Sequence, residues 1–224
     1  TRIVPEVGIK MLKDKGYEVV VNPEDRILTK EELITALKGQ NYDALFCLLT
    51  DEIDGGVMDA FGPQLKVVAN MAVGFDNIDI EEAKRHGIVV ANTPDVLTDT
   101  VAEHTFALML AIAHRIAEAD KFTKDLKYQG WAPMLFLGND LSGKTLGVIG
   151  FGRIGSRVAY QASKGFDMKV LYYDVKRNED FEKKFSAVYM PLEDLLRQSD
   201  FVSIHVPLLD STLHLINAEN LKLM

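Results

Sequence analysis

A glycine-rich turn between two apolar segments constrains this chain more than any other feature. Residues 145–149 read Thr-Leu-Gly-Val-Ile, an apolar strand, and residues 150–155 read Gly-Phe-Gly-Arg-Ile-Gly. A helix-compatible segment follows, and Asp174 ends a second apolar strand at 169–173. A Gly-x-Gly-x-x-Gly turn between strand and helix, with an acid about 20 residues on, is typical of dinucleotide-binding units. The alternative is an ordinary glycine turn in another α/β protein.

Each residue of this turn has a predicted part in holding a dinucleotide. Gly150 permits the tight turn, Gly152 lets the backbone approach a pyrophosphate, and Gly155 lets the helix pack against the strand. The free N–H groups at the start of the helix point at the phosphates. Phe151 to Ile154, including Arg153, are therefore expected to wrap the pyrophosphate.

The residue that ends the second strand predicts which dinucleotide is bound. Asp174 can accept hydrogen bonds from a ribose 2′-OH, as the acid of this fingerprint does in NAD sites. Val175, Lys176 and Arg177 follow it. The two cations could partly accommodate a 2′-phosphate, so NAD is the predicted cofactor and NADP is left open.

The composition excludes several classes of partner. The 224 residues carry a net charge of −8 at pH 7, whereas nucleic-acid binding needs clustered Lys and Arg. No apolar run reaches the ~18 residues of a membrane span. Cys47 is the single cysteine, so a reducing compartment, the cytoplasm, is expected. No metal is expected either, because metal-ligand spacing is missing around the five histidines, His86, His104, His114, His205 and His214.

Strand and helix patterns alternate along the chain, which predicts parallel sheets covered on both faces. Helices are expected over 30–38, capped by Thr29, and over 80–86. Strands are expected at Tyr17–Val21, 43–49, 65–69, 88–91, 145–149, 169–173, 187–189 and 201–205. A complete dinucleotide domain usually has six strands. Four are recognisable, and a strand before Thr1 is also missing, so we expect a chain truncated at both ends.

One long helix is predicted over Val101–Lys124. Thr100-x-x-Glu103 has the pattern of a capping box that would open it. Residues 106–113 are all apolar, and a helix that is apolar on most faces is buried. Its own domain or a second subunit could cover it, and we predict a homodimer built on this helix.

Several separated motifs resemble one enzyme family. They occur in the order Asn70–Asp79, 92–98 (Asn-Thr-Pro-Asp-Val-Leu-Thr), Ala102-Glu103, Gly130-Trp131, 141–145 (Leu-Ser-Gly-Lys-Thr) and 205–208 (His-Val-Pro-Leu). With them, the whole chain resembles the D-2-hydroxyacid dehydrogenases, and within these the glyoxylate/hydroxypyruvate reductases. The resemblance implies two doubly wound α/β domains. Residues 1–97 would form part of a flavodoxin-like substrate domain, and residues 98–224 part of a Rossmann NAD-binding domain.

The resemblance also assigns substrate-binding residues. Val73 and Gly74 match the loop whose backbone N–H groups hold the substrate carboxylate, and two successive N–H groups make an anion nest. Leu49 and Leu97 match positions that line the substrate and nicotinamide pocket. Trp131 either closes over that pocket or anchors its own loop by packing.

Further cofactor contacts follow from the same resemblance. Val101 and the segment His205-Val206-Pro207 are assigned to the cofactor, with Val206 and Pro207 forming an apolar wall on the adenine side. Some similar reductases that use NADP have Ser and Arg at the positions of Asp174 and Val175, which favours NAD here.

The activity implied is hydride transfer between a nicotinamide and C2 of a small 2-oxo acid, such as glyoxylate or hydroxypyruvate. The family's catalytic Arg, Glu and His lie downstream of the segment matching Leu221–Met224. No residue of this chain is therefore assigned to catalysis, and residues 1–224 alone are expected to be inactive. Two alternatives stay open: a D-3-phosphoglycerate dehydrogenase, and a non-catalytic NADH-sensing scaffold like the C-terminal-binding corepressors.

Overall fold

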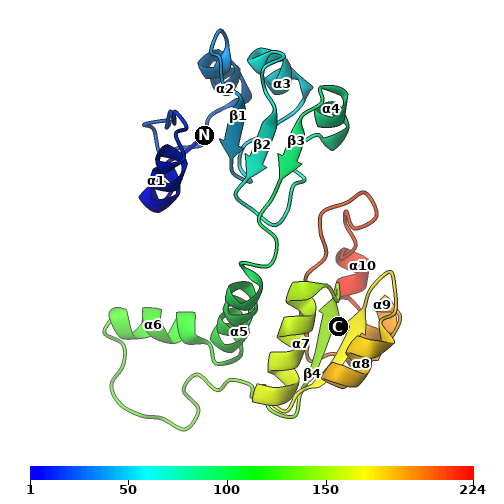
Figure 1. The fold of residues 1–224 in the computed structure, drawn as a ribbon. Helices are drawn as coiled ribbons and strands as arrows, with labels where there is room; N and C mark the ends of the chain where they lie inside the picture. Colours follow the sequence, from blue (N-terminus) through cyan, green and yellow to red (C-terminus); the bar gives the residue numbers. More distant parts are fainter. The chain divides into compact units, whose positions relative to one another are not determined.

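The computed structural model describes residues 1–224, which fold into two compact units, Thr1–Asp95 and Val96–Met224. Each unit has its own sheet flanked by helices (Figure 1). Every pairing between neighbouring strands is parallel. The predicted α/β class with parallel sheets is thus confirmed. No helix is long and apolar enough to cross a bilayer.

The first unit is built on a three-stranded sheet in the order β1-β2-β3. Its elements are α1 (Glu6–Asp14), α2 (Lys30–Leu37), β1 (Ala44–Cys47), α3 (Gly55–Phe61), β2 (Val67–Asn70), α4 (Ile80–Arg85) and β3 (Val89–Ala91). Helix α3 contacts both α2 and α4. Cys47, Val57 and Val68 are fully buried in the core between these helices and the sheet.

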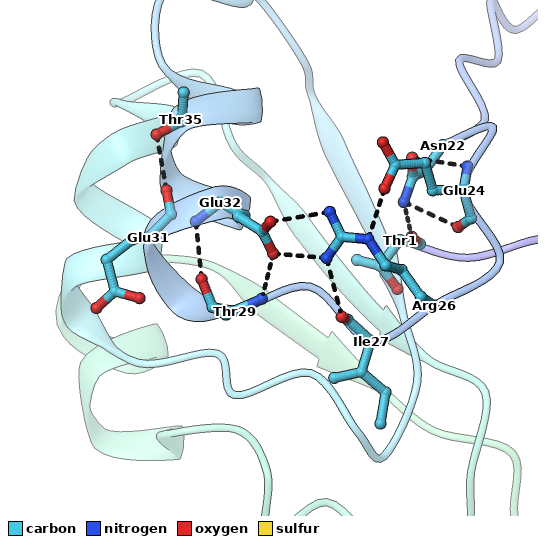
Figure 2. A network of polar contacts seen from close by, with 9 residues as sticks. All are labelled: Thr1, Asn22, Glu24, Arg26, Ile27, Thr29, Glu31, Glu32 and Thr35. Carbon is cyan, nitrogen blue, oxygen red and sulfur yellow. Dashed lines mark hydrogen bonds and ion pairs between the residues drawn. The ribbon is translucent and has the colours of Figure 1, made fainter.

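The start of α2 bears out the predicted cap. Thr29 Oγ1 accepts the N–H of Glu32, and the Glu32 carboxylate accepts the N–H of Thr29, which completes a capping box. Figure 2 shows that Arg26 joins this cap, donating to both oxygens of Glu32 at 2.7 and 2.8 Å. This hydrogen bonding lowers the pKa of Glu32 to about 2, so its carboxylate stays charged across the physiological range.

The expected strand at Tyr17–Val21 is wrong. These residues have no strand partner, and Tyr17 and Val20 are 65% and 63% exposed. The residues Tyr-Glu-Val-Val-Val have high strand propensity, but a strand forms only where a second strand pairs with its backbone groups. Here the segment is irregular and follows α1 directly.

The second unit has a four-stranded sheet in the order β6-β5-β4-β7. Its strands are β4 (Thr145–Ile149), β5 (Lys169–Tyr173), β6 (Ala187–Tyr189) and β7 (Phe201–Ile204), close to the predicted bounds. Its helices are α5 (Thr98–Ala113), α6 (Ile116–Lys124), α7 (Arg153–Gly165), α8 (Glu179–Phe185), α9 (Leu192–Gln198) and α10 (Ala218–Leu221). Separate apolar clusters involve α5 and α7 on one side and α9 on the other, so both faces of the sheet are covered.

The predicted helix over Val101–Lys124 is two helices, and its capping box is not formed. Helix α5 begins at Thr98 with no side-chain cap, so Thr100 lies inside its first turn. The helix is interrupted at Arg115, which has a left-handed φ of +54°. The carbonyl of Ala113 accepts the N–H of Asn139 at 2.9 Å. In a continuing α-helix, that carbonyl would instead accept the N–H of the residue four positions later. The loop that contains Asn139 therefore takes the place of the next helical turn, and α5 ends here.

Burial along α5 also differs from the expectation of a helix covered on most faces. The buried residues form one stripe of Ala102, Phe106, Met109 and Ala113. Leu108 and Ile112, on the other side, are 52% and 75% exposed. The helix therefore packs one face on its own unit and leaves an apolar face uncovered by this chain.

Candidate dinucleotide site

The glycine turn after β4 is sterically closed at its first and last positions. Gly150 has a φ of +88°, and a Cβ placed there would lie 2.7 Å from the backbone nitrogen of Val206. A Cβ on Gly155 would lie 2.1 Å from the carbonyl oxygen of Gly150. Both distances are too short for any side chain. Gly150 therefore makes the tight turn, and Gly155 lets α7 pack directly on it.

The middle glycine is open where the outer two are closed. A Cβ on Gly152 would meet no atom within 4 Å, and Gly152 is the N-cap of the 13-residue helix α7. Arg153 is exposed and Ile154 half-buried in the first turn of that helix. The first N–H groups of a helix lack partners within it and favour anions. The open space beside Gly152 lies where the sequence predicts the pyrophosphate to bind.

Asp174 is held beside this turn. Its Oδ2 accepts the backbone N–H of Phe151 at 2.7 Å, and its Oδ1 accepts the N–H of Lys176 at 3.4 Å. Phe151 and Asp174, each predicted to contact the cofactor, are therefore brought together from the ends of two neighbouring strands. A pocket of about 530 Å³ opens beside them, lined by Phe151, Asp174, Lys176, Arg177, Asn178, Glu179 and Asp180.

The two cations of this pocket are not equivalent. Lys176 is exposed, as is Val175 before it. Arg177 is paired: its Nε and Nη2 donate to the two carboxylate oxygens of Glu182 at 2.7 and 2.9 Å. Glu182 lies on α8, and its side chain is only 15% exposed.

The segment after β7 forms the far wall of the glycine turn. The N–H of His205 donates to the carbonyl of Ile149 at 2.7 Å, which places His205 and Val206 against Gly150. The imidazole lies 2.8 Å from Ser203 Oγ, and burial lowers the pKa of His205, which favours the neutral ring. Pro207 follows and is exposed. Val101 is half-buried on the first turns of α5, which packs against α7.

The loop after β2 holds the predicted carboxylate-binding residues in the first unit. Buried Asn70 donates to the carbonyl of Gly74 at 2.9 Å and to Asn77 Oδ1 at 3.0 Å. Asn92 Nδ2 donates to the carbonyl of Val73 at 2.9 Å. Both carbonyls of the predicted nest are therefore held by side-chain amides, which fixes the backbone of this loop.

The loop after β2 is also tied to the end of β1, where the predicted pocket residue Leu49 lies. Asn77 Nδ2 also donates to the carbonyls of Leu48 and Asp51, which ties the loop to the end of β1. Leu49 is 54% exposed there, and a Cβ on Gly74 would come within 3.8 Å of it. Asn70 and Asn77 lie within the motif Asn70–Asp79 and had no predicted role of their own. Asn70 directly follows the expected strand 65–69, a signal that could have marked it, whereas Asn77 has no comparable signal in the sequence.

Two further predicted residues stand apart from these contacts. Leu97, the residue before α5, belongs to the second unit and is 40% exposed. Trp131 is 82% exposed, so it does not anchor its loop by packing within this chain. It stays a predicted pocket residue.

The chain is similar to several known proteins. The family model described as D-isomer specific 2-hydroxyacid dehydrogenase, NAD binding domain, matches residues 106–224. A glyoxylate reductase of Thermococcus kodakarensis is 50% identical over 100% of this chain and 67% of its own length. The solved TT0316 protein of Thermus thermophilus is similar with a TM-score of 0.91 and 39% identity, covering 100% of this chain and 69% of that one.

One similar structure was solved with ligands bound. The D-lactate dehydrogenase of Aquifex aeolicus, in complex with NAD and lactic acid, has a TM-score of 0.83 and 34% identity to this chain. The match covers 99% of this chain and 64% of that protein. The chain thus spans about two thirds of the length of its relatives.

Proposed function

Because the chain belongs to the D-isomer specific 2-hydroxyacid dehydrogenase family, we propose that its protein reduces a small 2-oxo acid, glyoxylate or hydroxypyruvate, to the D-2-hydroxy acid with NADH. The observation that carries the proposal is the Asp174 carboxylate, which the N–H of Phe151 fixes beside a glycine turn that is open at Gly152. The similarity to glyoxylate reductases supports the substrate class.

The second unit supplies the cofactor site in this proposal. A bound nicotinamide cofactor supplies the hydride. Gly152 and the first turn of α7 receive the pyrophosphate, and Asp174 accepts hydrogen bonds from the ribose hydroxyls. Val206 and Pro207 wall the adenine side, with Val101 as a further contact. Because an ionised carboxylate can only accept hydrogen bonds and carries a negative charge, Asp174 favours a hydroxyl over a phosphate at the 2′ position.

The first unit supplies the substrate carboxylate site. The N–H groups of Val73 and Gly74 belong to a loop that two asparagine amides hold in place, and such paired N–H groups bind anions. Leu49 lies beside Gly74 and limits the room there. A short side chain on the 2-oxo acid fits this arrangement better than a long one.

No residue of 1–224 is assigned to proton transfer. His205 is the histidine beside the glycine turn, and its ring is held by Ser203 and favours the neutral form. We assign it a structural part at the adenine wall. The 224 residues by themselves are therefore expected to bind NADH without turning over substrate.

We also propose a homodimer through the exposed face of α5 and the start of α6. Leu108, Ile112 and Ile116 present exposed apolar side chains there. Exposed apolar patches on a protein surface mark association sites, and closed homodimers are the commonest soluble assembly.

The experiment that tests the proposed activity is NADH oxidation by the full natural protein with glyoxylate, hydroxypyruvate and a long-chain 2-oxo acid in turn. We expect turnover with the two short acids and a kcat/KM at least roughly tenfold lower with the long one, since a misplaced reacting centre costs rate steeply. If the protein binds NADH but none of the 2-oxo acids causes NADH oxidation, the proposed reductase activity is contradicted, and a dinucleotide-sensing scaffold is favoured.

A further inference from the structure

We propose that Glu182 is a positioning residue for cofactor choice: it holds the Arg177 guanidinium in an ion pair and so keeps it from binding a 2′-phosphate. The inference rests on the proposed function, because it concerns the ribose end of that cofactor site. It assigns a specificity role to a helix residue that lies outside the glycine turn and outside the lining of the pocket.

The geometry of the pair leaves the guanidinium engaged. Arg177 Nε donates to Glu182 Oε1 at 2.7 Å and Nη2 donates to Oε2 at 2.9 Å. This is a bidentate arrangement, the geometry by which arginine also binds phosphate. Arg177 lines the pocket beside Asp174, but two of its N–H donors are already bonded to Glu182, whose carboxylate offsets its positive charge.

A buried tyrosine fixes the position of this carboxylate. Tyr172 is fully buried, and its Oη donates to Glu182 Oε1 at 2.9 Å. The tyrosine Oη in turn accepts the backbone N–H of Asn178 at 2.9 Å. Glu182 is thereby tied to the core from one side and to the 174–178 loop through Arg177 and Tyr172. The carboxylate cannot swing away without leaving the tyrosine hydroxyl proton unpaired in the core.

The tyrosine also connects the pair to the glycine turn. The rings of Tyr172 and Phe151 are stacked with centroids 4.2 Å apart, and the N–H of Phe151 holds Asp174. One contact network therefore positions the carboxylate proposed to accept hydrogen bonds from the ribose hydroxyls and engages the arginine that would donate to a 2′-phosphate.

The balance of charge in the pocket follows from this arrangement. Asp174, Glu179 and Asp180 line it with Lys176 and Arg177. With Arg177 neutralised by Glu182, three carboxylates face one lysine. Without Glu182, a second cation would be available opposite the 2′ position. The pair thus converts a mixed pocket into an acidic one, which disfavours NADP.

The test uses small probes that reach only this end of the site. Binding of adenosine 5′-monophosphate and adenosine 2′,5′-bisphosphate to the protein is measured by titration calorimetry. In Glu182→Gln, the affinity for the bisphosphate relative to the monophosphate should rise about fivefold, the upper range for one solvent-exposed ion pair. Glu179→Gln is the matched control: it also removes one carboxylate charge of α8, this one from the lining of the pocket, without freeing Arg177, and its effect should be clearly smaller.

Two further variants separate a specific role from a general change in charge. The double variant Arg177→Gln/Glu182→Gln should return the relative affinity to within about twofold of wild type, because the freed guanidinium is then absent. If Glu182→Gln does not fold, Glu182→Asp, whose carboxylate is one methylene shorter, should change the relative affinity in the same direction.

The outcomes distinguish this inference from the proposed function. A relative affinity in Glu182→Gln equal to that in Glu179→Gln, or a gain that survives in the double variant, would overturn the inference while the monophosphate still binds. Failure of wild-type protein to bind either probe or NADH would overturn the proposed cofactor site itself.

Discussion

The backbone N–H of Phe151 donates to Asp174 Oδ2 at 2.7 Å, so the glycine turn itself holds the carboxylate proposed to meet the ribose. The bond joins the ends of β4 and β5. One hydrogen bond from the backbone therefore positions the proposed phosphate-binding half of the site relative to the proposed ribose-binding half. A substitution at either residue should alter the position of the other.

The first prediction concerns this carboxylate. Asp174→Ser with Val175→Arg should raise kcat/KM for NADPH relative to NADH by roughly tenfold or more. The double change removes the carboxylate that would repel a 2′-phosphate and adds a guanidinium that can donate hydrogen bonds to it. The measurement is steady-state kinetics of the full natural protein with both cofactors. Val175→Arg alone is the control, and it should shift the ratio less, since Asp174 would still oppose a phosphate.

The second prediction contrasts two glycines of the turn. Gly155→Ala places a Cβ 2.1 Å from the Gly150 carbonyl, so it should lower the free energy of unfolding by about 1–3 kcal/mol. Gly152→Ala meets nothing within 4 Å and should leave the Tm unchanged, yet weaken NADH binding by filling the pyrophosphate approach. Thermal unfolding and NADH titration of the two variants decide it. A large loss of Tm in Gly152→Ala would show that the open space assigned to the phosphate is absent.

The third prediction is a pH dependence in the first unit. His86 ends α4, and its Nε2 lies 2.9 Å from Asp59 Oδ1 on α3 while Nδ1 lies 2.8 Å from the Glu82 carbonyl. These contacts, with Asp59 first, raise the pKa of His86. The stabilisation is therefore fully present below the unfolded pKa of about 6.5 and is lost as the pH rises through the folded pKa.

His86→Gln should accordingly lower the Tm at a pH of about 5.5 and change it little at about 8.5, on either side of the titration. Asp59→Asn should reproduce the effect, because it removes the main cause of the raised pKa. Equal losses of Tm at both pH values for His86→Gln would mean that the residue stabilises the unit by packing rather than by its charge.

The fourth prediction addresses assembly. The full natural protein should have the mass of a dimer by light scattering at micromolar concentration, and Ile112→Glu should shift it toward the monomer, because the side chain is 75% exposed on the apolar face of α5. Val20→Glu in the first unit, also exposed, is the control and should not change the mass. A monomeric wild type would remove the proposed homodimer.

The parts of the fold that the sequence predicted correctly depend on local physics. The glycine turn, the strands beside it and the Thr29 cap each follow from residues a few positions apart, and each is present. The family and its parallel α/β architecture followed from several such motifs in order.

The errors arose where distant residues decide the structure. The end of α5 depends on the hydrogen bond from the N–H of Asn139 to the carbonyl of Ala113. No residue close to Ala113 in the sequence indicates that this bond forms. The Tyr17–Val21 pattern is strand-like but lacks a partner. In the site, the engagement of Arg177 depends on Tyr172 and Glu182 meeting around one loop, which spacing along the chain does not reveal.

The preference for one cofactor is tested by the ratio of kcat/KM for NADH to that for NADPH in glyoxylate reduction by the wild-type full natural protein. We predict a ratio well above one, because Asp174 is placed to accept ribose hydroxyls and Arg177 is engaged by Glu182. A ratio below one would contradict the role proposed for the Asp174 carboxylate, and with it the interpretation of this site as one built for NADH.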